Sequence, residues 1–250
     1  MRAIVLGSGS KGNSTLLIGQ NKKILIDVGF SYPRILKLLS DYNVTPNDID
    51  AILITHTHKD HIGGLASFVK KNMTPVYTNI NMYHELLSII KEENMIVNDD
   101  VYNIGEFNIE AIHTSHDAKG SVGFVINDGE SSLVYVTDTG YINSAYLKRL
   151  RNKTIYIFES NHDINMLMTG PYPYTLKQRV VSDKGHLSNE QSGNYLKEII
   201  GDKTKKIVLA HLSETNNTPE IAIKTVKNIL NTTISIETAL QDDTLDIGEF

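Results

Sequence analysis

Short apolar runs bounded by turn-forming residues recur along the whole chain. The first three runs, Arg2–Leu6, Ser14–Ile18 and Lys23–Asp27, are each bounded by Gly or Asn, which is typical of short β-strands. The same pattern predicts later strands at Ala51–Ile54, Phe107–Ile112, Val122–Ile126, Leu133–Val136, Ile155–Phe158, Ile207–Ala210 and Ile234–Ile236. The stretch from Val97 to Val136 has the pattern of a meander of hairpins.

Apolar residues at helical spacing predict helices between these strands. The predicted helices are Ser31–Ser40, Gly63–Lys70, Asn81–Glu93, Asn143–Leu150, Ser188–Ile200 and Pro219–Leu230, with Ser31 and Ser188 as candidate N-caps. Because strands cluster in both halves with helices between them, we expect two β-sheets packed face to face with helices outside, an α/β (α+β) sandwich. A doubly wound parallel sheet is the alternative, which the meander disfavours. The sequence has no repeat or linker, so we expect one domain over residues 1–250.

Composition narrows the class of protein. The chain has 250 residues, of which 40% are hydrophobic and 21% charged, which excludes intrinsic disorder. It has no cysteine, which excludes disulfides, cysteine metal ligands and a thiol nucleophile. The net charge of −5 excludes a globally basic nucleic-acid binder but leaves room for a local basic patch. The first apolar run is too short for a signal peptide, and no stretch approaches the ~18 apolar residues of a membrane helix, so we expect a cytoplasmic protein without a membrane partner.

Three histidines and an aspartate follow the apolar strand at Ala51–Ile54. In an extended segment, residues two apart face the same side, so His56, His58 and Asp60 are expected to converge, with His61 directed to a neighbouring position. Imidazole and carboxylate groups suit Zn²⁺ and similar divalent ions. A solvated polar loop and a single structural metal site are the alternatives.

Further candidate ligands follow other strands. His116, Asp138 and His211 each come soon after a predicted strand. Adjacent Asp60 and His61 could share one metal with His56 and His58 only with severe crowding. These two observations favour a pair of metals with a bridging carboxylate over a single site.

The set of motifs resembles the metallo-β-lactamase superfamily over nearly the whole chain. The matching features are HTHKDH after a strand, Asp27 at an earlier strand end, His116, TDTG around Asp138 and AHLS around His211. The resemblance implies a four-layer αββα sandwich with a dinuclear site at one sheet edge. It implies His56, His58 and His116 on the first metal, Asp60, His61 and His211 on the second, Asp138 as the bridge, and Asp27 orienting ligands by hydrogen bonds. His113 competes with His116, and the family pattern favours His116. Zn and Mn are the expected metals, and Fe also fits such a site.

Two residues of the second half bear on the chemistry. Glu159 follows a predicted strand and His186 precedes a predicted helix, in an order that resembles the RNase Z-type nucleases. The resemblance implies that Glu159 orients His186 and that His186 protonates the leaving oxygen, and we expect Asp60, Glu159 and His186 to be the catalytic residues. Without it, Glu159 reads equally well as a surface carboxylate and His186 as a neighbour of a helix N-terminus.

Several segments in order resemble the bacterial YycJ (WalJ) family: SGSKGNS, NHDINML, GPYPYTLKQRV, GHLSN and AHLSETNNTPE. This resemblance implies a 5′-to-3′ exonuclease acting on double-stranded DNA, with a metal-bridging hydroxide attacking phosphorus. The chain has no room for the long insertion of RNase J-like enzymes and no recognisable tRNA-gripping arm, which argues against RNA processing. Residues near the motifs that could contact substrate are Asn13, Lys119, Asn161, Lys177, Arg179 and Asn216. For Tyr172 and Tyr174, packing is expected rather than stacking on a base.

Two other functions stay open at this point. The same metals could serve a small-molecule hydrolase of a cyclic phosphodiester, lactone or thioester, which a compact closed pocket with no basic groove would favour. A metal-containing binding module without catalysis is the other, and the complete ligand set argues against it.

Overall fold

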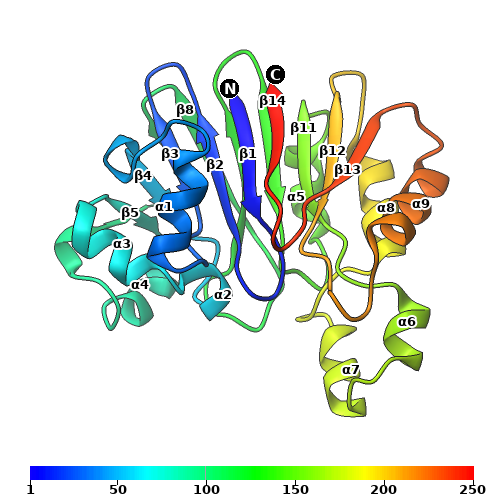
Figure 1. Cartoon of the computed structure of the whole chain (residues 1–250). Coiled ribbons are helices and arrows are strands. Elements are labelled where there is room, and N and C mark those ends of the chain that lie inside the picture. Colours follow the sequence, from blue (N-terminus) through cyan, green and yellow to red (C-terminus); the bar gives the residue numbers. More distant parts are fainter. Residues whose placement is uncertain (99) are drawn as a thin grey trace.

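Two mixed β-sheets, each of seven strands, form the centre of the molecule in the computed structural model, which describes residues 1–98 and 100–250 (Figure 1). The first sheet has the order β14-β1-β2-β3-β4-β5-β6. Its strands are β1 (Arg2–Gly7), β2 (Ser14–Ile18), β3 (Lys23–Ile26), β4 (Ala51–Leu53), β5 (Val76–Thr78), β6 (Met95–Val97) and β14 (Leu245–Glu249). The second sheet has the order β13-β12-β11-β10-β9-β8-β7. Its strands are β7 (Val101–Ile104), β8 (Phe107–His113), β9 (Val122–Asn127), β10 (Ser132–Val136), β11 (Ile155–Glu159), β12 (Lys206–Ala210) and β13 (Ser235–Thr238).

Helices cover the outer face of each sheet, as Figure 1 shows. The first sheet carries α1 (Tyr32–Ser40), α3 (Leu65–Asn72) and α4 (Ile80–Leu86), and the second carries α5 (Ser144–Leu150), α8 (Asn189–Ile199) and α9 (Pro219–Leu230). Ser188 caps α8 in a capping box, whereas Ser31 precedes α1 without a side-chain cap. The predicted four-layer α/β sandwich is confirmed.

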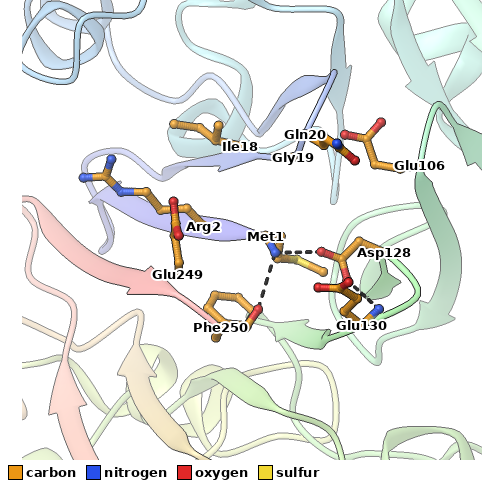
Figure 2. A pocket seen from close by; sticks show the side chains of 10 residues that line it. All are labelled: Met1, Arg2, Ile18, Gly19, Gln20, Glu106, Asp128, Glu130, Glu249 and Phe250. Carbon is orange, nitrogen blue, oxygen red and sulfur yellow. Dashed lines mark hydrogen bonds and ion pairs between the residues drawn. The ribbon is translucent and has the colours of Figure 1, made fainter.

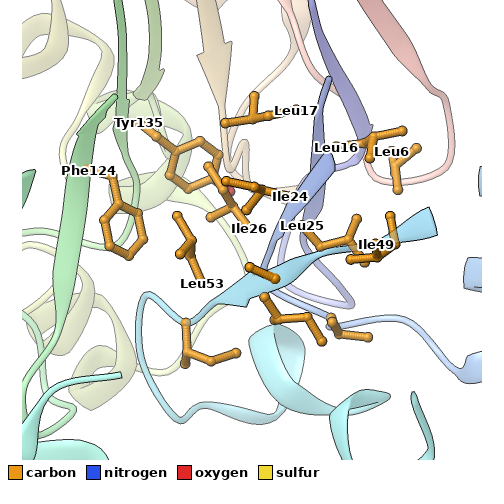
Figure 3. Packing of buried hydrophobic residues seen from close by; sticks show 14 of the residues in the cluster. Leu6, Leu16, Leu17, Ile24, Leu25, Ile26, Ile49, Leu53, Phe124 and Tyr135 are labelled. Carbon is orange, nitrogen blue, oxygen red and sulfur yellow. The ribbon is translucent and has the colours of Figure 1, made fainter. Parts of the chain in front are cut away.

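The main core lies between the two sheets. Phe124 and Tyr135, from β9 and β10, face Ile24, Ile26 and Leu53, from β3 and β4 (Figure 3). All five side chains are 2% exposed or less, and burying one such side chain is worth about 1.5–3 kcal/mol. This continuous apolar layer holds the ends of both sheets in fixed relative positions.

Several elements differ from the sequence-based expectation. The predicted helix Asn81–Glu93 ends early, at Leu86. Three short helices, α2 (Lys59–Ile62), α6 (Ile164–Thr169) and α7 (Tyr174–Val180), were not predicted, nor were strands β5, β6, β7 and β14 as separate elements. These pieces have three to seven residues, and strands of the same length were predicted only where turn-forming residues bound an apolar run.

The carboxyl ends of the parallel strands lie at one edge of the sandwich. Strands β3 and β4 pair in parallel in the first sheet, and β10, β11 and β12 do so in the second. Both chain ends lie at the opposite edge in Figure 1. Ligand sites in open α/β sheets form outside the carboxyl ends of strands, so the edge away from the termini is where a site is expected.

A cavity of about 700 Å³ lies at the edge with the termini (Figure 2). There the amino group of Met1 forms an ion pair of 2.6 Å with Asp128. Its lining includes the carboxylates Glu106, Glu130 and Glu249 but no histidine, unlike the predicted site. Within the described residues, no helix has the length and apolar character needed to cross a bilayer.

Candidate active site

The predicted site residues come from strand ends of both sheets. Asp27 follows β3, His56 follows β4, Asp138 follows β10 and His211 follows β12, while Glu159 is the last residue of β11. Asp27, Asp138 and His211 have left-handed backbones, with φ of 61°, 57° and 57°. Such conformations are uncommon for residues other than glycine and turn the chain sharply at the end of a strand. The side chains of distant segments thereby meet at the edge predicted above.

Three histidines form a first group. Nδ1 of His58 lies 3.1 Å from Nε2 of His56 and 3.2 Å from Nε2 of His116. In a tetrahedral site with metal–nitrogen bonds of about 2.0–2.1 Å, neighbouring donors lie about 3.3 Å apart. These three nitrogens therefore have the spacing that one metal ion requires.

A second group lies beside the first. Nε2 of His61 and Nε2 of His211 lie 3.4 and 3.7 Å from Oδ2 of Asp60. The carboxylate of Asp138 lies between the groups, with Oδ2 3.3 Å from Nε2 of His61 and Oδ1 3.8 Å from Nε2 of His116. One carboxylate thus reaches the donors of both groups.

The expectation for Asp60 was wrong in one respect. His58 is the N-cap of α2, which begins at Lys59, so the segment is not extended beyond His58. The helical turn carries Asp60 and His61 together toward His211 instead of leaving Asp60 beside His56 and His58.

Unpartnered atoms show that the two groups fit a cation. Oδ2 of Asp138 and Nε2 of His211 are buried and make no hydrogen bond to any of the described residues. A buried polar atom without a partner is costly, and a metal ion between these donors removes that cost. Burial holds the pKa of His56 and His116 below the ordinary value, which favours the neutral imidazole that binds metal. Burial opposes ionisation of Asp138, but the surrounding histidines outweigh it and hold the pKa well below its usual range.

Interior residues orient the second group. Asp27, fully buried, accepts hydrogen bonds from the Thr55 backbone nitrogen at 2.8 Å, from Oγ1 of Thr55 at 2.7 Å and from Nδ1 of His61 at 2.7 Å. The last bond directs Nε2 of His61 toward Asp60 and Asp138. Asn13 is also fully buried, and its Nδ2 lies 3.0 Å from Nε2 of His61 and 2.9 Å from the Gly9 carbonyl oxygen. Asn13 therefore contacts the site from inside the protein and offers no surface to a substrate.

Glu159 and His186 form a pair next to these groups. Nδ1 of His186 donates to Oε1 of Glu159 at 2.7 Å, and Oε2 accepts from the backbone nitrogens of Thr139 and Leu187 at 2.9 and 3.1 Å. Burial opposes ionisation of Glu159, but His186 and His211 outweigh it and lower the pKa of Glu159 to about 2. Glu159 is thus a buried carboxylate anion that fixes the ring of His186, and not a surface carboxylate.

A cavity of about 210 Å³ exposes the site to solvent. Five candidate metal ligands line it: His58, Asp60, His116, Asp138 and His211. The rest of the lining includes His186, Tyr172, Leu176, Arg179 and Val180. A second hollow of about 440 Å³ shares Ser10 and Asp60 with it. This hollow is lined by two lysines, of which Lys11 forms an ion pair of 2.6 Å with Glu214 and Lys59 is exposed, so at least one cation lies beside the site.

The predicted substrate-contact residues divide into two sets. Arg179 and Asn161 line the cavity, where Nδ2 of Asn161 donates to the His211 carbonyl oxygen at 2.9 Å. Lys177 donates instead to the Met168 carbonyl oxygen at 2.7 Å, and Asn216 is buried. Lys119 is exposed and does not line the cavity.

Two further residues near the predicted ligands are His113 and Asp117. His113, the competitor of His116, pairs with Asp100 at 3.2 Å and is absent from the ligand groups. Asp117, directly after His116, was not predicted: its Oδ2 pairs with Nη2 of Arg179 at 2.6 Å, and its Oδ1 lies 3.5 Å from Nε2 of His58. The adjacency of an acid to a ligand histidine was the available signal.

Comparisons with known proteins agree with this geometry. The sequence profile of the Metallo-beta-lactamase superfamily matches residues 7–211. The exodeoxyribonuclease WalJ of Streptococcus pneumoniae is 37% identical over 233 residues, covering 90% of this chain and 87% of that protein. The exodeoxyribonuclease YycJ of Bacillus anthracis is 36% identical over 231 residues, covering 90% and 88%. The metallo-beta-lactamase fold protein YhfI of Bacillus subtilis superposes with a TM-score of 0.75 at 20% identity, over 98% of this chain and 100% of that one.

Proposed function

Because this chain belongs to the metallo-beta-lactamase superfamily, and within it to the family of the WalJ and YycJ exodeoxyribonucleases, we propose that it is a metal-dependent exonuclease acting on DNA. The proposed substrate is double-stranded DNA, degraded in the 5′-to-3′ direction. One observation carries the proposal: His186, held by Glu159, lines the same cavity as members of both ligand groups, and that cavity adjoins a hollow lined by Lys11 and Lys59. Since the site draws residues from both sheets, we further propose that residues 1–250 act as one domain.

The protein binds divalent metal, and we assign two ions to it, Zn²⁺ or Mn²⁺ with Fe²⁺ as a further candidate. His56, His58 and His116 would hold one ion, Asp60, His61 and His211 the other, and Asp138 would contact both. Divalent ions at these positions supply a nucleophilic water at neutral pH and neutralise charge on the phosphate oxygens.

His186 is the proposed general acid of the reaction. Hydrolysis forms a bond between water oxygen and phosphorus and breaks the bond between phosphorus and a sugar oxygen, which leaves with a proton. His186 lines the cavity, and its Nδ1 is occupied by Glu159, so Nε2 is the atom left to deliver that proton. The hydrogen bond to Glu159 fixes the orientation of the ring.

The surroundings of the site favour a polymer over a small molecule. A closed pocket would suit a small-molecule hydrolase, but the cavity continues into the hollow with Lys11 and Lys59. Lys59 is exposed, and Arg179 borders the cavity itself. Cations on both sides of the site can contact successive phosphates of one strand.

A nuclease assay on end-labelled DNA tests the proposal. Single- and double-stranded DNA and RNA are incubated with protein loaded with Zn²⁺, Mn²⁺ or Fe²⁺, and label release is followed from each end. We expect hydrolysis of duplex DNA from 5′ ends, and a loss of roughly 10²–10⁴-fold for His186→Ala with unchanged metal content. His84→Ala, on the exposed part of α4, is the matched control. Metal-loaded protein that binds DNA and leaves every substrate intact contradicts the proposed function.

A further inference from the structure

One wall of the site cavity is apolar, although its other walls carry charged and metal-binding groups. Tyr172, Leu176 and Val180 line this wall, and all three come from the segment that contains α6 and α7. In Figure 1 these two helices project from the edge of the sandwich that carries the site. Neither the ligand groups nor the His186–Glu159 pair explains an apolar surface at this place.

The apolar wall is held in position before any substrate binds. Tyr172 lies between Pro171 and Pro173, and a residue that precedes proline is restricted to extended conformations. Leu176 and Val180 are four residues apart on α7, so they share one face of that helix. A preformed surface loses little conformational entropy on binding.

Two contacts fix α7 against its surroundings. Nζ of Lys177 donates to the Met168 carbonyl oxygen in α6 at 2.7 Å, and Arg179 forms the ion pair of 2.6 Å with Asp117. One contact ties α7 to its partner helix, and the other ties it to the segment of His116. The wall therefore keeps its distance from the metal-binding groups.

The wall also adjoins the proposed general acid. The backbone nitrogen of His186 donates to the Val180 carbonyl oxygen at 2.9 Å, and Nδ1 of His116 lies 3.2 Å from the Gly185 carbonyl oxygen. A group that receives a proton from His186 consequently lies next to the apolar wall. In phosphodiester hydrolysis, that group is the sugar oxygen of the leaving nucleoside.

We propose that this wall is the binding subsite for the terminal nucleoside of the strand, whose base stacks on Tyr172. The proposal rests on the proposed nuclease function. It adds that the terminal nucleoside binds at the apolar wall and that the rest of the strand lies on the other side of the site. The cavity of about 210 Å³ is smaller than the roughly 300–1,000 Å³ of common ligand pockets, which favours a single nucleoside against this wall. The rest of the strand continues through the hollow beside Lys59.

The subsite specifies what each cut releases. The bond from phosphorus to O3′ of the 5′-terminal nucleoside breaks, O3′ takes the proton from His186, and the oxygen of water stays on the phosphorus of the remaining strand. One nucleotide leaves per cut, and the shortened strand carries a new 5′-phosphate.

Paired substrates and paired variants test the subsite. Duplex DNA with an intact or an abasic 5′-terminal nucleotide is given to the wild type, Tyr172→Leu, Tyr172→Phe and Tyr174→Leu. Tyr174 is the matched control because it is 75% exposed and does not line the cavity. Base–aromatic stacking predicts that the wild type loses about 5- to 100-fold in kcat/KM on the abasic end. Tyr172→Leu should lose a similar factor in kcat/KM on the intact end and should then have equal kcat/KM on intact and abasic ends. Tyr172→Phe and Tyr174→Leu should behave as the wild type.

Binding and product length give independent readouts. Fluorescence anisotropy with the protein in EDTA, and DNA labelled at the far end, should give the same order of Kd values for the four proteins without any turnover. In a separate cleavage reaction with DNA labelled at the 5′ end, the first labelled product should be a mononucleotide. Equal rates on intact and abasic ends, a Tyr172→Leu protein that matches Tyr174→Leu, or a first product of two or more nucleotides would overturn the subsite. Those results all require an active nuclease, so they differ from failure of the proposed function, in which the wild type cuts no DNA.

Discussion

Replacing Asp27 with asparagine tests how the protein orients its second group of metal ligands. Three donors point at this buried carboxylate: the backbone N–H and the hydroxyl of Thr55, and Nδ1–H of His61. An amide of the same shape offers one acceptor oxygen and one NH₂ donor. If the amide oxygen accepts from the Thr55 nitrogen, the NH₂ group faces Nδ1 of His61. The ring proton must then move to Nε2, which is the atom that faces Asp60 and Asp138. With its oxygen on His61, the NH₂ faces the Thr55 N–H, which then loses its partner.

The magnitude follows from what the substitution breaks. Removing a partner that fixes the tautomer of a ligand histidine lowers metal affinity by about 10–100-fold, or roughly 1.4–2.8 kcal/mol. The loss should be greatest for the ion held by Asp60, His61 and His211. The group of His56, His58 and His116 is linked to Asp27 only indirectly, through Oγ1 of Thr55, which lies 3.1 Å from Nδ1 of His56, so its ion should be affected less.

Metal titration at controlled free Zn²⁺ or Mn²⁺ measures the effect. At concentrations that saturate the wild type with two ions, Asp27→Asn should retain one, and it should regain the second at about 10–100-fold higher free metal. Asp100→Asn is the matched control, because Asp100 also pairs with a histidine, His113, at 3.2 Å, outside the site. A thermal melt confirms folding of both variants. Wild-type affinity for both ions in Asp27→Asn, or parallel loss of both, would refute this account.

Two other predictions use the same protein. Lys59→Gln should weaken DNA binding and reduce the slope of log K against log[salt] by about 1, because one phosphate contact is lost. The control Lys224→Gln, on α9, should change neither the affinity nor the slope. An unchanged slope for Lys59→Gln would show that Lys59 does not contact the DNA. Chelation should lower the Tm by about 5–10 °C, because metal at 100 times its Kd stabilises the folded chain by about 2.7 kcal/mol, and identical melting curves with and without EDTA would contradict metal binding at these residues.

The sandwich was predictable where apolar runs are bounded by turn-forming residues or by helix caps. Strand β2 (Ser14–Ile18) and helix α9 (Pro219–Leu230) have the bounds that their apolar patterns indicate. Seven short elements were not predicted separately, although strands as short as β4 were; the seven are α2, α6, α7, β5, β6, β7 and β14. Helix α7 is the instructive case: its sequence is half polar and follows two prolines, which reads as loop, yet it forms one wall of the cavity.

The sequence predicted which residues form the candidate site better than it predicted how those residues are arranged. Residue type and position after a strand identified the histidines and aspartates that the structure brings together. The extended-chain argument failed at Asp60, because nothing in a four-residue polar segment reveals the turn of helix α2. Asn13 was misread for a related reason: a polar residue in a glycine-rich loop suggests exposure, but the folded loop buries it against His61.

The packed sheets stabilise backbone conformations at the site that are unfavourable on their own. Asp27, Asp138 and His211 hold left-handed backbones, each costing of order 1–3 kcal/mol. Oδ1 of Asp138 lies 3.8 Å from Nδ1 of His186, and Oε1 of Glu159 lies 3.3 Å from Nδ1 of His211. Oδ2 of Asp138 makes no hydrogen bond to any residue that the structure describes. Strained backbones and an unmatched acceptor persist only where rigid neighbours enforce them, and here the apolar layer between the sheets does so. The packing of the two sheets therefore holds these candidate donors at the spacing that a metal ion requires.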